Sequence, residues 1–112
     1  MTSVSDQTQE QQEVAFQIIA SVGSARSLYI EAIHAAGDGR LDEASGLIAQ
    51  GRDEFLRGHH AHMSLVQKAA ADGGLPADIL LVHAEDQLMS AEGFGILAEE
   101  FVSLYRRFYA AQ

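Results

Sequence analysis

Apolar residues recur every three or four positions through most of the chain, and this spacing predicts α-helices. Two short segments interrupt the pattern, residues 37–39 (Gly-Asp-Gly) and residues 73–76 (Gly-Gly-Leu-Pro). Glycine and proline are the residues that mark turns most strongly. They therefore divide the chain into three stretches of similar length, and we expect one helix in each, the first beginning near Gln11.

The first two stretches each present one continuous apolar face. Steps of three and four residues place side chains on the same side of a helix. In the first stretch this face is formed by Val14, Ile18, Val22, Ala25, Tyr29 and Ile33. In the second stretch it is formed by Leu41, Ala44, Ile48, Gly51, Phe55, Gly58, His62, Leu65 and Ala69. Its small residues would let a neighbouring helix approach closely.

The third stretch follows Pro76, and Asp78 is well placed to cap its helix. Its apolar residues form two stripes. The first stripe contains Ile79, Val82, Asp86, Met89, Gly93 and Ile96, and the second contains Leu97, Phe101, Leu104 and Phe108. The carboxylate of Asp86 is unusual there, because a charge on an apolar face is costly unless it is paired or bound to a metal.

Three helical stretches joined by short turns predict an all-α fold. Each helix would contain about 30 residues and measure roughly 45 Å, and short connections make neighbouring helices antiparallel. We expect an up-down-up antiparallel three-helix bundle over residues 12–112, after a frayed or disordered N-terminus at residues 1–11. Apolar residues outside the stripes need further cover, which favours self-association.

Composition narrows the function classes. The 112 residues suit one domain, and 7 Lys+Arg against 16 Asp+Glu give a net charge of −9 at pH 7. Nucleic acid and anionic membranes are poor partners for such a surface. The absence of cysteine excludes disulfides, thiolate catalysis and Cys-ligated metals within the chain. With no signal peptide and no apolar run near the roughly 20 residues that span a bilayer, we expect a cytoplasmic protein.

Histidines are the candidate chemical groups. His34 lies near the end of the first helix, where a positive charge suits the helix dipole. His59 and His62 would share a helical face. Three interpretations fit this pair: a metal site, a polar pair that lines a cleft, or plain surface residues. His83 lies in an apolar turn, three residues before Asp86. Taken alone, such a histidine is more often a core residue than a reactive one.

Residues 83–90 read His-Ala-Glu-Asp-Gln-Leu-Met-Ser. They resemble the signature of the lactose/cellobiose/chitobiose-type enzyme IIA of the phosphoenolpyruvate-dependent sugar phosphotransferase system. That signature is close to His-(Ala/Gly)-Gln-Asp-His-Leu-Met-(Thr/Ser), on the third of three helices. The resemblance covers roughly residues 12–107 and includes residues 23–27, 35–39, His59, the Leu-Pro pair at 75–76 and residues 104–106.

The resemblance implies a phosphotransferase component that works as a phosphoryl relay. His83 would accept a phosphoryl group from the carrier HPr and pass it to a cysteine of enzyme IIB, which serves the membrane enzyme IIC in uptake of a β-linked disaccharide. The family also implies a nine-helix homotrimer, in which Asp86 from each protomer meets Mg²⁺ or a similar divalent cation on the threefold axis. We expect His59, His62 and Gln87 to line the site. A neutral imidazole is a suitable nucleophile near pH 7.

Two positions depart from the signature: Glu85 replaces a neutral glutamine, and Gln87 replaces a second histidine. A carboxylate that pointed at the phosphorylated histidine would weaken transfer by like-charge repulsion, although helix positions two apart do not face each other. The alternative function is therefore a catalytically degenerate, trimeric helical module that regulates or binds partners. A histidine-phosphotransfer domain is a third alternative, but such domains typically carry a lysine soon after the histidine.

Overall fold

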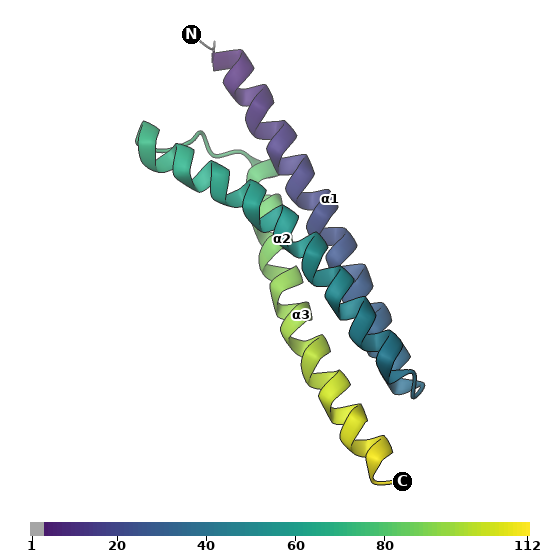
Figure 1. The fold of residues 1–112 in the computed structure, drawn as a ribbon. Helices are drawn as coiled ribbons and strands as arrows, with labels where there is room; N and C mark the ends of the chain where they lie inside the picture. The colour runs from purple at the N-terminus through teal and green to yellow at the C-terminus, as the bar shows by residue number, and fades with distance from the viewer. Residues whose placement is uncertain (1–3) are drawn as a thin grey trace.

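The computed structural model describes residues 4–112, which form three long helices (Figure 1). They are α1 (Val4–Gly37), α2 (Leu41–Asp72) and α3 (Ile79–Ala110). The chain runs along α1, back along α2 and forward again along α3, so the predicted up-down-up three-helix bundle is confirmed. The bundle is long and thin, with principal extents of 64 × 19 × 19 Å. No helix in this described part is both long enough and apolar enough to cross a membrane.

Helix α1 begins at Val4, earlier than the start near Gln11 that the apolar pattern predicts. The frayed start expected over residues 1–11 lies partly outside the described residues, and its described part, residues 4–11, is helical. The side chain of Gln11 is buried and donates hydrogen bonds to the carbonyl of Pro76 at 2.8 Å and to Oδ2 of Asp78 at 3.2 Å. This contact ties the early part of α1 to the loop before α3.

Both predicted turns are confirmed. Gly39, Gly73 and Gly74 adopt positive φ angles of 83°, 77° and 132°, a conformation that only glycine adopts without strain. The predicted cap of α3 is also present, because Oδ1 of Asp78 accepts a hydrogen bond from the amide of Leu81 at 2.7 Å. These local signals account for where α2 ends and where α3 begins.

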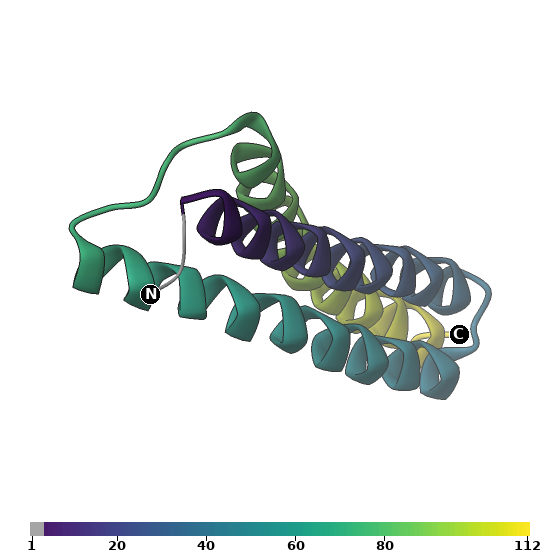
Figure 2. The same cartoon turned by 90° about the horizontal axis from the view of Figure 1, so that it is seen from above.

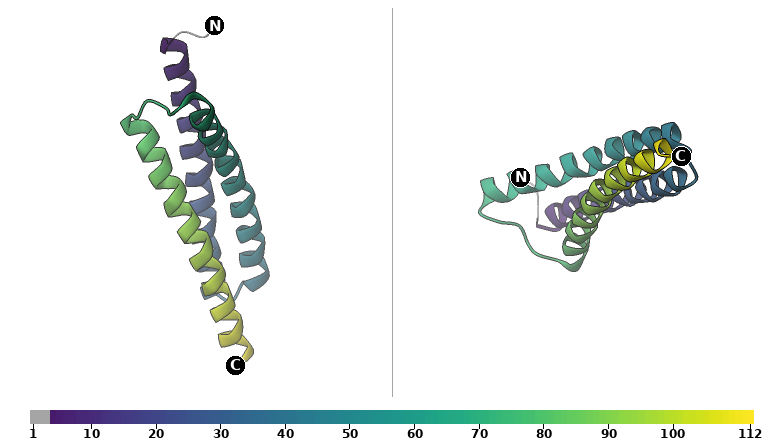
Figure 3. Two further views of the ribbon diagram at one scale, coloured as in Figure 1. Left: turned by 90° about the vertical axis from the view of Figure 1, so that its left-hand side faces the viewer. Right: turned by 90° about the horizontal axis from the view of Figure 1, so that it is seen from below.

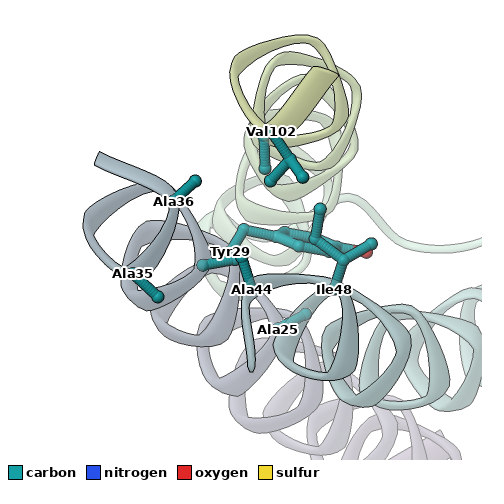
Figure 4. Close-up of a cluster of buried hydrophobic side chains, with 9 residues drawn as sticks. Ala25, Tyr29, Ala35, Ala36, Ala44, Ile48 and Val102 are labelled. Atoms are coloured by element: carbon teal, nitrogen blue, oxygen red, sulfur yellow. The ribbon is translucent and has the colours of Figure 1, made fainter. Parts of the chain in front are cut away.

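The apolar faces predicted for the first two helices form the core. Tyr29 of α1 lies beside Ile48 of α2 and Val102 of α3 (Figure 4). Its ring fits only because two facing residues have no side chain: a Cβ atom would lie 2.7 Å from the ring at Gly51 and 3.0 Å from it at Gly95. Gly95 is therefore explained by packing against Tyr29.

The three helices do not cover one another equally. Helix α1 packs extensively against both partners, whereas α2 and α3 touch each other least. Figures 2 and 3 show that the end of α2 and the start of α3 lie well apart, bridged by the loop at residues 73–78. Helix α3 is consequently the least covered helix along much of its surface.

Candidate functional site

Helix α3 buries a narrow face made mostly of small side chains. The buried residues are Ala84, Leu88, Ala91, Ala98 and Val102. The two stripes predicted from the sequence lie on the other side and are exposed: Ile79, Val82, Met89, Ile96, Leu97, Phe101, Leu104 and Phe108. An exposed apolar surface of this extent marks an interaction site. The stripes therefore do not face the core of the protomer.

Asp86 lies exposed within this apolar surface, between Val82 and Met89. Gly93 follows two turns later, and a Cβ atom there would meet nothing within 4 Å. Among the described residues, no three His, Asp or Glu side chains gather closely enough to hold a metal ion. One protomer thus offers Asp86 as a single hard oxygen ligand on this surface, which is only part of the oxygen shell of a divalent cation.

His83 is exposed and lies beside the apolar surface, about 60° around the helix from Asp86. The same flank of α3 carries Ser90, whose Oγ accepts a hydrogen bond from the guanidinium of Arg26 at 3.2 Å. That contact shows that the His83 flank borders α1. Gln87 is half-buried one turn after His83. The structure therefore brings Gln87, but neither of the other predicted site-lining residues, to the His83 side of α3.

Glu85 lies on the opposite flank, because helix positions two apart are about 200° apart around the axis. Its Oε1 is 3.1 Å from Nε2 of His62 on α2. An ionised carboxylate can only accept hydrogen bonds, so a hydrogen bond at this contact has Nε2 of His62 as its donor. Within one protomer, Glu85 points away from His83.

The remaining histidines have separate surroundings. The ring of His59 stacks on Phe55 of the same helix, with centroids 6.2 Å apart and an interplanar angle of 17°. His60 is exposed. His34 lies in the last turn of α1, where the dipole favours a cation. His59 and His62 thus sit on the α2 side of α3, across the helix from His83.

Comparison with known proteins identifies the family. Residues 13–106 match the family described as the PTS system lactose/cellobiose-specific IIA subunit. The oligo-beta-mannoside-specific EIIA component of Bacillus subtilis is 34% identical over 95 residues, which are 85% of this chain and 86% of that protein. The PTS cellobiose-specific enzyme IIA from Bacillus anthracis has a TM-score of 0.86 at 31% identity, covering 100% of this chain and 97% of that one.

A solved complex is also similar. The IIA(Chitobiose)–HPr complex of Escherichia coli matches with a TM-score of 0.78 at 27% identity, covering 88% of this chain and 96% of the matched chain. These matches span nearly the whole bundle, so the protein is an enzyme IIA component of a sugar phosphotransferase system. Within that class it belongs to the lactose/cellobiose family, which confirms the resemblance seen at residues 83–90.

Proposed function

We propose that the chain is a phosphocarrier that accepts a phosphoryl group from phospho-HPr on His83 and passes it to a cysteine of enzyme IIB. The observation that carries the proposal is the exposed position of His83 on α3, within the segment that resembles the family signature. In the first step, the P–N bond to the HPr histidine breaks as a P–N bond to His83 forms. In the second, that bond breaks as a P–S bond to the acceptor thiolate forms.

The surroundings of His83 suit such an exchange. Phosphoryl transfer passes through a loose transition state, so catalysis consists mainly of positioning and charge stabilisation. Exposure lets two partners reach the imidazole in turn. The amide of Gln87 lies on the same flank, and the Arg26 guanidinium at Ser90 supplies positive charge further along it. The thiol belongs to the partner, since this chain has no cysteine.

We further propose a homotrimer, with nine helices, in which the exposed apolar surface of α3 faces the threefold axis. Asp86 from each copy would then hold Mg²⁺ or a similar divalent cation, whose positive charge offsets the three carboxylates. In a threefold assembly, one flank of each protomer meets the opposite flank of the next. The His83 flank would therefore face the neighbouring copy's flank that carries His59 and His62, and these residues would line the site from there.

The similar proteins support HPr as a partner and a β-linked sugar as the transported substrate. HPr is present in the similar complex, and the similar proteins are specific for oligo-beta-mannoside, cellobiose or lactose. We propose that the protein acts in the cytoplasm between HPr and enzyme IIB, and that it serves the membrane enzyme IIC indirectly during uptake of a β-linked disaccharide.

Phosphorylation with enzyme I, HPr and phosphoenolpyruvate tests this function. We expect an acid-labile, base-stable phosphate on the wild-type chain, loss of that label in His83→Ala, and normal labelling of the control His60→Ala. A wild-type chain that stays unlabelled while HPr is labelled would overturn the proposal and favour the regulatory module instead. Equal labelling of wild type and His83→Ala would move the site to another residue.

A further inference from the structure

We propose that Arg26 stabilises the phosphoryl group on His83 through its positive charge, and that Ser90 is the positioning residue that holds the Arg26 guanidinium beside this site. The proposal rests on the proposed function in one respect, namely that His83 carries the phosphoryl group. It adds residues from two helices to the site, because Arg26 belongs to α1 and Ser90 to α3.

The guanidinium of Arg26 lies along the same flank of α3 as His83. Its Nη1 donates a hydrogen bond to Oγ of Ser90 at 3.2 Å, and both side chains are half-buried. Ser90 follows His83 by seven residues, so the two side chains point in directions that differ by about 20° and lie roughly 10 Å apart along the helix axis. The contact therefore fixes a positive charge two turns from the imidazole.

Arg26 differs from most cations of this acidic chain because its hydrogen-bond partner is neutral. The chain has 7 Lys+Arg against 16 Asp+Glu. Most of these cations pair with a carboxylate: Arg40, Arg52, Arg57, Lys68 and Arg106. Within residues 4–112, Arg107 resembles Arg26 in having no such pair, but it lies in the last turn of α3, where the helix dipole favours a cation. Arg26 lies in the middle of α1, where the dipole gives no such reason.

The surroundings of Arg26 leave its charge uncompensated. One turn to either side, α1 carries residues that are not acidic: Val22, Gly23, Tyr29 and Ile30. At Gly23 an added Cβ would meet nothing within 4 Å, so α1 leaves open space on the side toward His83. On α3, Asp86 lies one turn before Ser90, but the guanidinium bonds to the Ser90 hydroxyl. The remaining N–H donors of Arg26 are thus available to an anion.

The proposed homotrimer makes this positive charge more important. In that assembly the His83 flank faces the neighbouring copy's flank, on which Glu85 contacts His62. The neighbouring carboxylate would add negative charge near a phosphoryl group that itself carries about −1.5 to −2. Arg26 comes from the same protomer as His83, and its charge would offset both groups.

Coulomb's law sets the size of the effect. For a unit positive charge and a phosphoryl group at roughly 10–12 Å in a water-like medium, the attraction corresponds to a factor of about two to four in rate or equilibrium. Salt weakens it, because the Debye length is about 10 Å at 0.1 M ionic strength. A carboxylate at position 90 would pair with Arg26 and cancel its charge, so Ser90→Asp should have the same effect as loss of the guanidinium.

Phosphoramidate provides a test that needs no partner protein. Its P–N bond breaks as a P–N bond to His83 forms, and the nitrogen leaves as ammonium with the proton that the imidazole gives up. We would measure the initial rate of phosphate gain by mass spectrometry of the intact chain, with His83→Ala as the baseline. The variants are Arg26→Gln, Arg26→Lys and Ser90→Asp. Urea unfolding checks that each one folds, and Arg26→Met replaces Arg26→Gln if the latter does not.

Arg40→Gln is the matched control, because it changes the net charge by the same amount. Arg40 pairs with Asp38 and Glu43 in the turn between α1 and α2, at the other end of the bundle from the start of α3 (Figure 1). This control should react at the wild-type rate.

We expect Arg26→Gln and Ser90→Asp to react about two- to fourfold more slowly than wild type at low salt, with both deficits shrinking at high salt. Arg26→Lys should keep the wild-type rate, since it keeps the charge. A merely structural role predicts a different pattern. If the contact only tied α1 to α3, an ion pair in Ser90→Asp would preserve the tie and leave the rate unchanged.

Three results would overturn the proposal: a wild-type rate in Arg26→Gln or in Ser90→Asp, an equal deficit in Arg40→Gln, or a deficit that persists at high salt. A chain whose His83 takes no phosphate from phosphoramidate would overturn it as well. Failure of the relay is seen separately. In that case phospho-HPr would not label wild type, while phosphoramidate would still give the order of rates described above.

Discussion

Replacing Met89 with serine tests whether the exposed face of α3 is an assembly surface. Met89 is 70% exposed in the protomer and lies between Asp86 and Gly93 on the apolar stripe. In a threefold assembly through this stripe, each copy would bury its Met89 near the axis. Serine removes the apolar side chain, adds no charge and leaves α3 otherwise intact.

The expected loss of trimer stability follows from the exposed fraction of Met89. Fully burying a methionine side chain contributes about 1.5–3 kcal/mol, so burying the exposed 70% of Met89 contributes about 1–2 kcal/mol per copy. Three copies lose about 3–6 kcal/mol, which raises the trimer dissociation constant about 10²–10⁴-fold. Because that constant scales with the square of concentration, the midpoint of dissociation should move about 10–100-fold.

Sedimentation velocity over a nanomolar-to-micromolar dilution series measures that midpoint. The protomer mass is 12.1 kDa, so the wild type should sediment with three times that mass, and the variant should dissociate at much higher concentration. Gln50→Ser, at an exposed position on α2, is the control and should behave as wild type. A wild-type monomer at micromolar concentration, or an unchanged midpoint in Met89→Ser, would refute the reasoning.

Three further predictions concern the protomer and can be read from urea unfolding followed by circular dichroism. Gly51→Ala should lower the free energy of unfolding by about 1–3 kcal/mol, because its Cβ would lie 2.7 Å from the Tyr29 ring. At Gly46 an added Cβ would meet nothing within 4 Å, so Gly46→Ala should raise the free energy of unfolding by up to about 1 kcal/mol. Equal changes in stability for Gly51→Ala and Gly46→Ala would contradict this account. Asp78→Ala should cost about 1 kcal/mol through loss of the α3 cap, and an unchanged stability would argue that the cap is dispensable. Burial raises the pKa of Tyr29, and the Arg52 charge has a smaller opposing effect. The unfolded chain therefore loses the Tyr29 proton near pH 10, whereas the folded chain keeps it, so the free energy of unfolding should fall above pH 10. Tyr29→Phe removes this proton and should make that fall shallower.

The fold could be predicted from the sequence because its main signals are local. Glycine turns, the Asp78 cap and the apolar faces of α1 and α2 each act within a few residues, and all are present. The early start of α1 has no such signal. Its first turns are polar, and Gln11 is fixed by a contact with a loop 65 residues away.

Which face of α3 is buried could not be predicted from the sequence, for a different reason. Its large apolar residues form the stripes, whereas its buried face is built from alanines such as Ala84 and Ala98. A pattern of hydrophobicity favours the stripes, since alanine contributes little to it. The candidate site shows the same limit. Glu85 departs from the family signature, but only the packing of α2 on α3 reveals that its carboxylate contacts His62.

The position of His83 beside the apolar stripe, rather than on it, would make the proposed trimer compatible with the proposed phosphoryl transfer. In the proposed trimer, a histidine at the position of Val82 or Met89 would be buried, and no partner could reach it. His83 is offset by about 60° from Asp86 around the helix, so burial of the stripe would leave its imidazole at the edge of the interface between copies. There it would remain open to HPr and enzyme IIB in turn, in a site fixed by packing on both sides. Under this proposal one helix would provide both the assembly surface and the relay residue, because its buried face consists mostly of small side chains.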